Sequence, residues 1–160
     1  MIQNWDNEIQ QFIVLCEKQD VRMLMVGGGA VNFHGYQRHS ADVDFWIETT
    51  AENFKKLILV FHEMGFELED FPEEVKNQNQ NISIKFSPSS LNLELITRFS
   101  INKTFEEAFL QSEKVEVKEL NFLRWNVLSL EDLITSKIKA GRPKDLLDIQ
   151  QLKEINKDLL

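Results

Sequence analysis

The sequence is poor in the residues and patterns that mark secreted or membrane proteins. It has one cysteine, three prolines and one tyrosine in 160 residues, and no apolar run long enough to span a bilayer. Cys16 therefore cannot form an internal disulfide, and its place in QQFIVLCEK predicts a buried structural thiol. The first residues, MIQNWDNEIQ, are polar and acidic, unlike a secretory signal. We expect a cytoplasmic protein with no membrane partner.

Positive charge is also scarce. The chain has 18 Lys and Arg against 26 Asp and Glu, a net charge of -8, which argues against nonspecific coating of nucleic acid. A local basic groove could still bind one phosphate-rich ligand. What the chain does have is 42% hydrophobic content with 12 Phe, enough for the core of a single domain over residues 1–160.

Apolar periodicity and turn residues predict alternating helices and strands. We expect helices near residues 5–16, 30–34, 50–64, 104–112 and 130–139, a last helix carrying Leu146, Leu147, Ile149 and Leu152, and strands near 23–26, 42–47, 66–68, 81–86, 91–96 and 115–120. Thr49 with Glu52 and Ser129 with Asp132 are spaced as capping boxes, and Pro88 suits a hairpin turn. The polar stretch 73–81 predicts an exposed loop. This order gives an α+β or α/β class, a mixed sheet flanked by helices.

Two aspartates interrupt the strand DVDFWI. Alternation places Val43, Phe45 and Ile47 on one face, and Asp42, Asp44 and Trp46 on the other. Two strand residues span roughly 6.6 Å, so the carboxylates could converge on a pair of divalent cations. Like charges this close repel unless a cation compensates. The alternative is that the aspartates are strand-end caps or surface charges.

Other residues could complete a phosphate site. In LNLELI, Glu94 lies opposite the leucines and could join the two aspartates, although alternation on a half-exposed strand explains it nearly as well. Gly27 and Gly28 would let a phosphate approach the backbone, and Arg38 adds a forked cation. The glycines could equally form a simple turn. P-loop, dinucleotide-binding and kinase motifs are missing.

The run VGGGAVNFHGYQRHSADVDFWI resembles the core motif of the DNA polymerase β-like nucleotidyltransferase superfamily: a strand, a Gly-Gly turn, a short helix and Asp-x-Asp on the next strand. Together with SLEDLITSKIKAGRPKDLLDIQQL, it is similar to small bacterial members that include abortive-infection and toxin–antitoxin nucleotidyltransferases. The resemblance covers about a third of the chain. It implies the nucleotidyltransferase fold, with helices at the C-terminal end.

The resemblance also implies roles for individual residues. Asp42, Asp44 and Glu94 would be catalytic and would bind Mg²⁺ or Mn²⁺; the nucleotide-binding residues would be Gly27, Gly28, Arg38, Ser40 and Lys137. Arg142 and Lys144 match further basic positions. The family usually has Asp where Glu94 stands and often Thr where Ser40 stands, so this chain departs from the pattern there. The charged residues from Lys137 to Asp148 are also typical of a solvated helical face.

Three functions remain open on the sequence. The first is a metal-dependent enzyme that transfers a nucleoside monophosphate from a nucleoside triphosphate to a hydroxyl acceptor, such as tRNA, a protein or a small molecule, within a toxin–antitoxin or defence system or in antibiotic resistance. The second is a module of the same fold that binds a nucleotide or a protein without turnover. The third is an interaction protein in which the acids are incidental.

Overall fold

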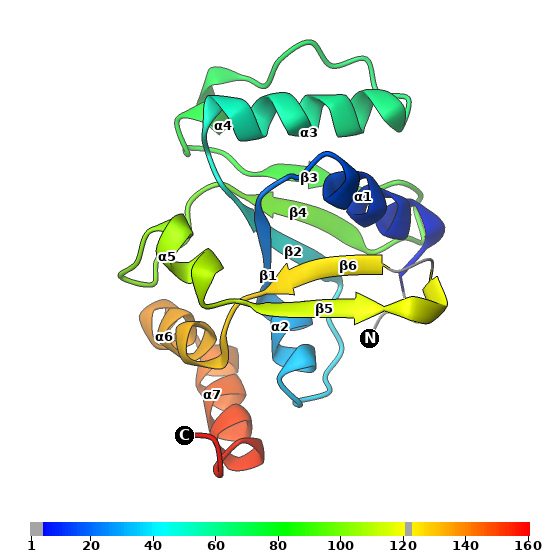
Figure 1. The fold of residues 1–160 in the computed structure, drawn as a ribbon. Coiled ribbons are helices and arrows are strands. Elements are labelled where there is room, and N and C mark those ends of the chain that lie inside the picture. The colour runs from blue at the N-terminus through cyan, green and yellow to red at the C-terminus, as the bar shows by residue number, and fades with distance from the viewer. Residues whose placement is uncertain (1–4, 121–122) are drawn as a thin grey trace.

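The computed structural model describes residues 5–120 and 123–160 as a six-stranded mixed sheet with helices around it (Figure 1). The strand order is β3-β4-β2-β1-β6-β5. The strands are β1 (Met23–Val26), β2 (Asp42–Ile47), β3 (Ile82–Ile84), β4 (Asn92–Ile96), β5 (Glu113–Val117) and β6 (Leu123–Val127). The mixed α+β class predicted from the sequence is confirmed.

The helices divide between two sides of the sheet. They are α1 (Asn7–Lys18), α2 (Gly27–Phe33), α3 (Ala51–Glu63), α4 (Glu73–Lys76), α5 (Phe105–Leu110), α6 (Leu130–Ala140) and α7 (Pro143–Ile155), with a 3-10 turn at Lys118–Leu120. In Figure 1, α1 and α3 lie together on one side, and α6 and α7 lie near the end of the sheet where α2 begins. Phe12 of α1 and Phe61 of α3 touch in the core between them.

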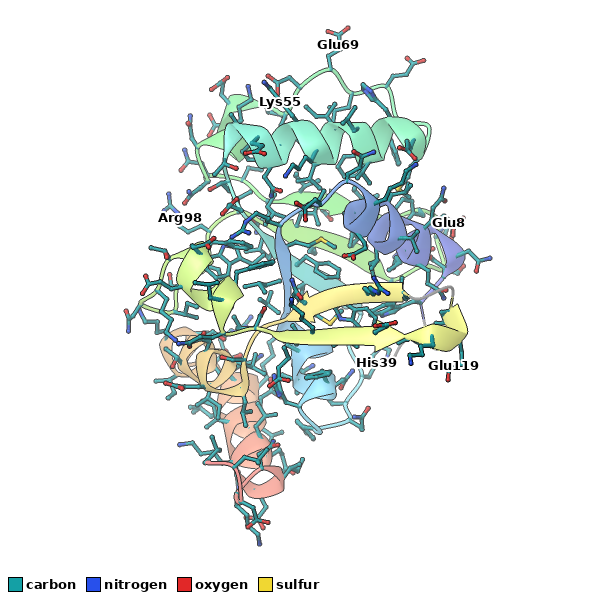
Figure 2. The ribbon with its side chains drawn as sticks, in the orientation of Figure 1. Glu8, His39, Lys55, Glu69, Arg98 and Glu119 are labelled. Carbon is teal, nitrogen blue, oxygen red and sulfur yellow. The ribbon has the colours of Figure 1, made fainter. Side chains whose placement is uncertain are left out.

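The sheet buries one face of each central strand in that core. Val43, Phe45 and Ile47 of β2 are almost fully buried, as alternation predicts. On the solvent side of this helical layer, charged side chains such as Glu8, Lys55 and Glu69 project outward (Figure 2). The predicted hairpin forms from β3 and β4, which pair antiparallel on either side of the turn that contains Pro88. Cys16 is buried, as expected.

Several local predictions are wrong. Residues 66–68 form no strand, and the predicted loop at 73–81 contains the single turn α4, which buries Val75. Strand β6 was not predicted, although it lies inside the sheet and pairs with both β1 and β5. Its sequence LRWNV alternates buried apolar residues with Arg124 and Asn126, so the signal of a half-buried strand was present and was missed.

Helix starts are predicted to within a residue or a few. Thr50, not Thr49, caps α3 by accepting a hydrogen bond from the Asn53 N–H. Ser129 caps α6 as expected by accepting from the Asp132 N–H, but the Asp132 carboxylate pairs with Lys103 instead of completing a box. Within residues 5–120 and 123–160, no helix is both long and apolar enough to cross a membrane.

Candidate active site

Strands β2 and β4 bring the three predicted acids to one face of the sheet. They pair in parallel with Asp42 opposite Asn92 and Asp44 opposite Glu94, so Asp42, Asp44 and Glu94 all point away from the α1–α3 core. All three side chains are partly buried. The strand register therefore makes Asp44 the neighbour of both other carboxylates.

The electrostatics of Asp44 reflect this crowding. Burial first, and then the charges of Asp42 and Glu94, raise the pKa of Asp44 to about 6 against the opposing effect of Lys137 and Lys144. The negative charge on this face is thus only partly compensated by the protein's own cations. Such a pocket of unbalanced negative charge is suited to a bound cation.

The glycine turn lies directly against Asp44. Gly27 has φ +61°, in the left-handed region, and a methyl group there would overlap the Oδ2 atom of Asp44. A methyl group on Gly28 would lie 2.5 Å from the Ser40 hydroxyl oxygen, which is too close. Both glycines belong to the first turn of α2. This helix starts at Gly27 and not at Ala30 as predicted. Only glycine leaves room for Asp44 and Ser40 at these two positions.

Gly27→Ala should consequently disturb the site more than the fold. We expect at least a tenfold loss of nucleotidyl transfer, because the added methyl group displaces the Asp44 carboxylate. The matched control is Gly65→Ala: Gly65 also has a positive φ, +93°, but its added methyl group meets nothing within 4 Å. The melting temperature should fall by a similar amount in both variants, whereas the rate of transfer should fall only in Gly27→Ala. Equal transfer by the two variants would contradict this assignment.

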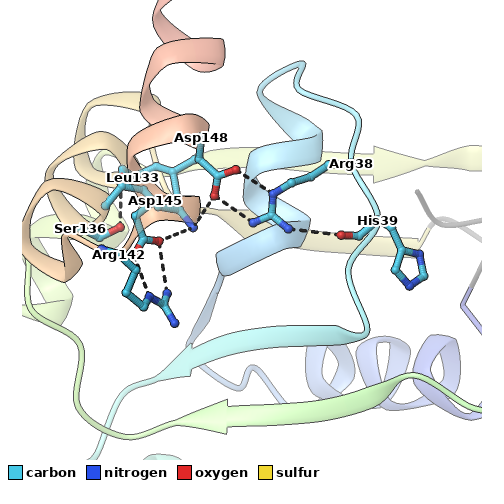
Figure 3. A network of polar contacts seen from close by, with 8 residues as sticks. Arg38, His39, Leu133, Ser136, Arg142, Asp145 and Asp148 are labelled. Atoms are coloured by element: carbon cyan, nitrogen blue, oxygen red, sulfur yellow. Dashed lines mark hydrogen bonds and ion pairs between the residues drawn. The ribbon is translucent and has the colours of Figure 1, made fainter.

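A buried charge network joins the C-terminal helices to the glycine turn (Figure 3). Lys137 of α6 has its Nζ 3.4 Å from Asp145 and 3.0 Å from Asp148, both on α7. Arg38 reaches Asp148 from the other side through two bonds of 2.8 and 2.9 Å, and its third nitrogen donates to the His39 carbonyl. At the start of α7, the Asp145 carboxylate accepts hydrogen bonds from the Arg142 backbone N–H and from the Arg142 guanidinium.

The prediction of a solvated face for these residues is wrong for three of them. Asp145 is 0% exposed, Asp148 1% and Lys137 6%, whereas Leu146 and Leu147 of α7 are 58% and 48% exposed. Burial raises the pKa of Asp148, but hydrogen bonds and charges from Arg38 and Lys137 outweigh it and hold the pKa below its ordinary value. Helix α7 is thus held against α6 and Arg38 by buried ion pairs. The sequence signal that could have indicated this buried network was a Lys on one helix and two Asp on the next.

The predicted nucleotide-binding residues are brought to this end of the sheet in different states. Gly27, Asp44 and Lys137 line one cavity of about 190 Å³, and Arg142 lies at the same cavity. Arg38 and Ser40 lie against Gly28, but the guanidinium of Arg38 is bound to Asp148 and the Ser40 hydroxyl donates to the Asp42 carbonyl. Their roles toward a nucleotide stay predictions.

Aromatic residues that sequence reasoning did not single out form the apolar part of the cavity. Phe99 and Ile96 line it, and Trp46 packs on Phe99 and Phe105 with ring centroids 5.2 and 5.1 Å apart. Trp46 is buried, as its expected packing role requires. A larger apolar pocket of about 380 Å³ lies elsewhere, between α3 and β3, and includes Phe61 and Ile82. We place the site at the smaller cavity because Asp44 and Gly27 line it, although Asp42 and Glu94 do not.

The donor set fits a hard divalent cation. Asp42 and Asp44 provide carboxylate oxygens on one face of the sheet, and Asp44 lies directly against Gly27. Over the described ranges, no three His, Cys, Asp or Glu side chains converge closely enough to hold a metal without other ligands. Mg²⁺ is typically bound by one or two carboxylates together with substrate phosphates, so this arrangement fits a metal that arrives with its substrate.

Two solved structures share the fold of this chain. A lincosamide adenylyltransferase, LnuA, crystallised with lincomycin, matches with a TM-score of 0.59 and 19% identity over 95% of this chain and 99% of that one. ANT(2")-Ia, crystallised with adenylyl-2"-tobramycin, matches with a TM-score of 0.52 and 13% identity over 96% of this chain and 88% of that one. At these identities the likeness concerns the fold.

The family is identified by sequence. Residues 2–159 match the family described as nucleotidyltransferase of unknown function (DUF6036), and the chain belongs to it. It is therefore a nucleotidyltransferase, as the Gly-Gly turn and the Asp-x-Asp strand predict. No curated protein matches the chain in sequence.

Proposed function

We propose that the protein is a divalent-metal-dependent enzyme that transfers a nucleoside monophosphate from a nucleoside triphosphate to a hydroxyl group of a small molecule. The observation that supports this most is the register of β2 and β4, which puts Asp42, Asp44 and Glu94 on one face of the sheet, with Asp44 against Gly27. The cavity at Asp44 adds an apolar wall of Phe99 and Ile96, which suits part of a nucleoside.

The residues divide the chemistry between them. Asp42 and Asp44 would hold Mg²⁺ or Mn²⁺, which when bound lowers the pKa of a hydroxyl and offsets charge on the phosphoryl group. Glu94 lies on the far side of Asp44 from Gly27, where it can ligate the ion or accept the proton of the acceptor hydroxyl. The acceptor oxygen forms a bond to the α-phosphorus, the bond from that phosphorus to the bridging oxygen breaks, and pyrophosphate leaves. Lys137 lies at the same cavity, where its charge favours the triphosphate.

A small-molecule acceptor is favoured by the molecules bound to the two structural neighbours. The two structural neighbours were crystallised with lincomycin and with adenylyl-2"-tobramycin, and this chain covers 99% and 88% of their lengths. The aligned chains thus reach a comparable size in proteins that bind small acceptors. RNA or protein acceptors, which would accord with a toxin–antitoxin role, are treated as alternative outcomes of the test.

The test is transfer of label from α-³²P nucleoside triphosphates. Each triphosphate is incubated with the protein and Mg²⁺ or Mn²⁺, and with lincomycin, tobramycin, other hydroxylated antibiotics, tRNA or a protein extract as acceptor. We expect a labelled small molecule and released pyrophosphate, both abolished by EDTA. Label in tRNA or protein would overturn the small-molecule acceptor. Nucleotide binding without pyrophosphate release under all conditions would indicate a binding module and overturn catalysis.

A further inference from the structure

The two outer carboxylates of the site are each held by an uncharged side chain of the β3–β4 hairpin. The Asn92 side-chain amide donates to Asp42 Oδ1 at 3.0 Å, and the Ser83 hydroxyl donates to Glu94 Oε1 at 2.6 Å. Both bonds follow from strand register, since Asn92 lies opposite Asp42 and Ser83 lies opposite Glu94. The hairpin therefore places one donor at each acid.

We propose that Asn92 and Ser83 are positioning residues for the metal-binding acids: Asn92 orients Asp42 toward the bound cation, and Ser83 holds Glu94 beside the acceptor. The inference rests on the proposed function. It assigns a role in the reaction to two residues that no sequence motif marks, and it makes the β3–β4 hairpin part of the active site.

The chemistry of the donors favours this role over neutralisation. Three carboxylates on one face repel, so unrestrained side chains would rotate apart. An amide and a hydroxyl each orient one oxygen through a charge-assisted hydrogen bond and leave the carboxylate its negative charge and its other oxygen. A Lys or Arg in either place would compete with the cation. Hydrogen-bonding partners of this kind commonly fix the orientation of metal ligands.

The geometry also fixes which end of the Asn92 amide faces Asp42. A carboxylate accepts hydrogen bonds and cannot donate one when ionised, so the amide nitrogen and not its oxygen must face it. Replacing Asn92 with leucine keeps the size of the side chain and removes the donor. Ser83→Ala removes the hydroxyl and Ser83→Thr keeps it, which gives a matched comparison at this position.

The experiment measures Mn²⁺ binding separately from turnover. Free Mn²⁺ is followed by electron paramagnetic resonance during titration of the protein with Mn²⁺ alone, because a nucleotide in solution would itself bind the ion. We expect Asn92→Leu to raise the Kd for Mn²⁺ by about 10- to 100-fold. We expect Ser83→Ala to lower kcat about tenfold with KM for the nucleotide unchanged, and Ser83→Thr to restore it. Asn126→Leu, on β6, is the control and should leave both quantities unchanged.

The outcomes separate this inference from the proposed function. If Asp42→Asn binds Mn²⁺ as well as the unchanged protein does, the metal site itself is wrong and both proposals fail. If Asp42→Asn loses Mn²⁺ but Asn92→Leu keeps it within twofold, Asn92 is merely structural and the inference fails alone. Equal kcat for Ser83→Ala and Ser83→Thr would remove Ser83 from the proposal in the same way. Thermal unfolding in EDTA identifies any variant that fails to fold.

Discussion

Asp44→Asn is expected to abolish nucleotidyl transfer and, in metal-free buffer at pH 8, to make the protein more stable. Transfer should fall by more than about 100-fold, since loss of a metal ligand costs more than loss of a residue that only orients one. The stability gain has a separate cause. The Asp44 pKa of about 6 lies above its ordinary value of 3.8, so the folded protein disfavours the ionised form.

The pH dependence follows from that direction. Between about pH 4 and 6 the folded state holds the Asp44 proton more tightly than the unfolded state, so raising the pH through this window reduces the stability of the native protein. The full penalty, on the order of 1–3 kcal/mol, applies above pH 6 and is absent below pH 4. Asparagine carries no charge and escapes it.

The measurement is urea unfolding in EDTA at a series of pH values, beside the transfer assay. The difference in unfolding free energy between Asp44→Asn and the unchanged protein should grow from near zero at pH 4 to its maximum by about pH 7. Glu69→Gln, an exposed acid-to-amide change outside the site, is the control and should alter neither quantity. A difference that stays flat with pH, or a variant that still transfers label, would contradict the place given to Asp44.

Lys137→Met is expected to cost about 3–5 kcal/mol of folding stability. Methionine preserves much of the length and apolar surface of the side chain but removes the ammonium group that Asp145 and Asp148 share. Both aspartates are almost fully buried, so the change leaves negative charge in the interior with only the arginines opposite it. Removing one partner of a buried pair costs more than the intact pair contributes.

A neighbouring lysine supplies the comparison for this prediction. Lys139 lies on the same helix and is exposed, so Lys139→Met should change stability by no more than about 0.5 kcal/mol. Lys137→Met combined with Asp145→Asn should recover part of the loss, because it removes one of the uncompensated charges. Urea unfolding at pH 7 measures all three proteins. A loss of unfolding free energy below about 1 kcal/mol in Lys137→Met would show that the ammonium group does not stabilise the buried aspartates.

Local sequence patterns were sufficient to predict the strands that bury one apolar face. The alternation in DVDFWI and LNLELI predicted both the strands and the side on which Asp44 and Glu94 lie. Register could not be read in the same way, because it depends on which strands become neighbours. The pairing of Asp44 with Glu94, and of Asn92 with Asp42, therefore emerged only from the fold.

Sequence reasoning failed where charged residues are inside. It assigned the α7 aspartates to a solvated face, since buried carboxylates are rare without partners. The partners are Lys137 and Arg38, which come from other elements and are not visible in the α7 sequence alone. The same reason explains why Arg38 was expected to be available for phosphate, although its guanidinium is engaged by Asp148.

The ion pair between Arg38 and Asp148 joins positions 110 residues apart, and so it constrains the order in which a newly made chain can mature. Synthesis runs from the N-terminus, so the glycine turn and the Asp-x-Asp strand leave the ribosome well before α7 exists. Until that last helix docks, Arg38 has no Asp148 to hold it. The charge network around Asp148 can therefore form only after α7 has been synthesised.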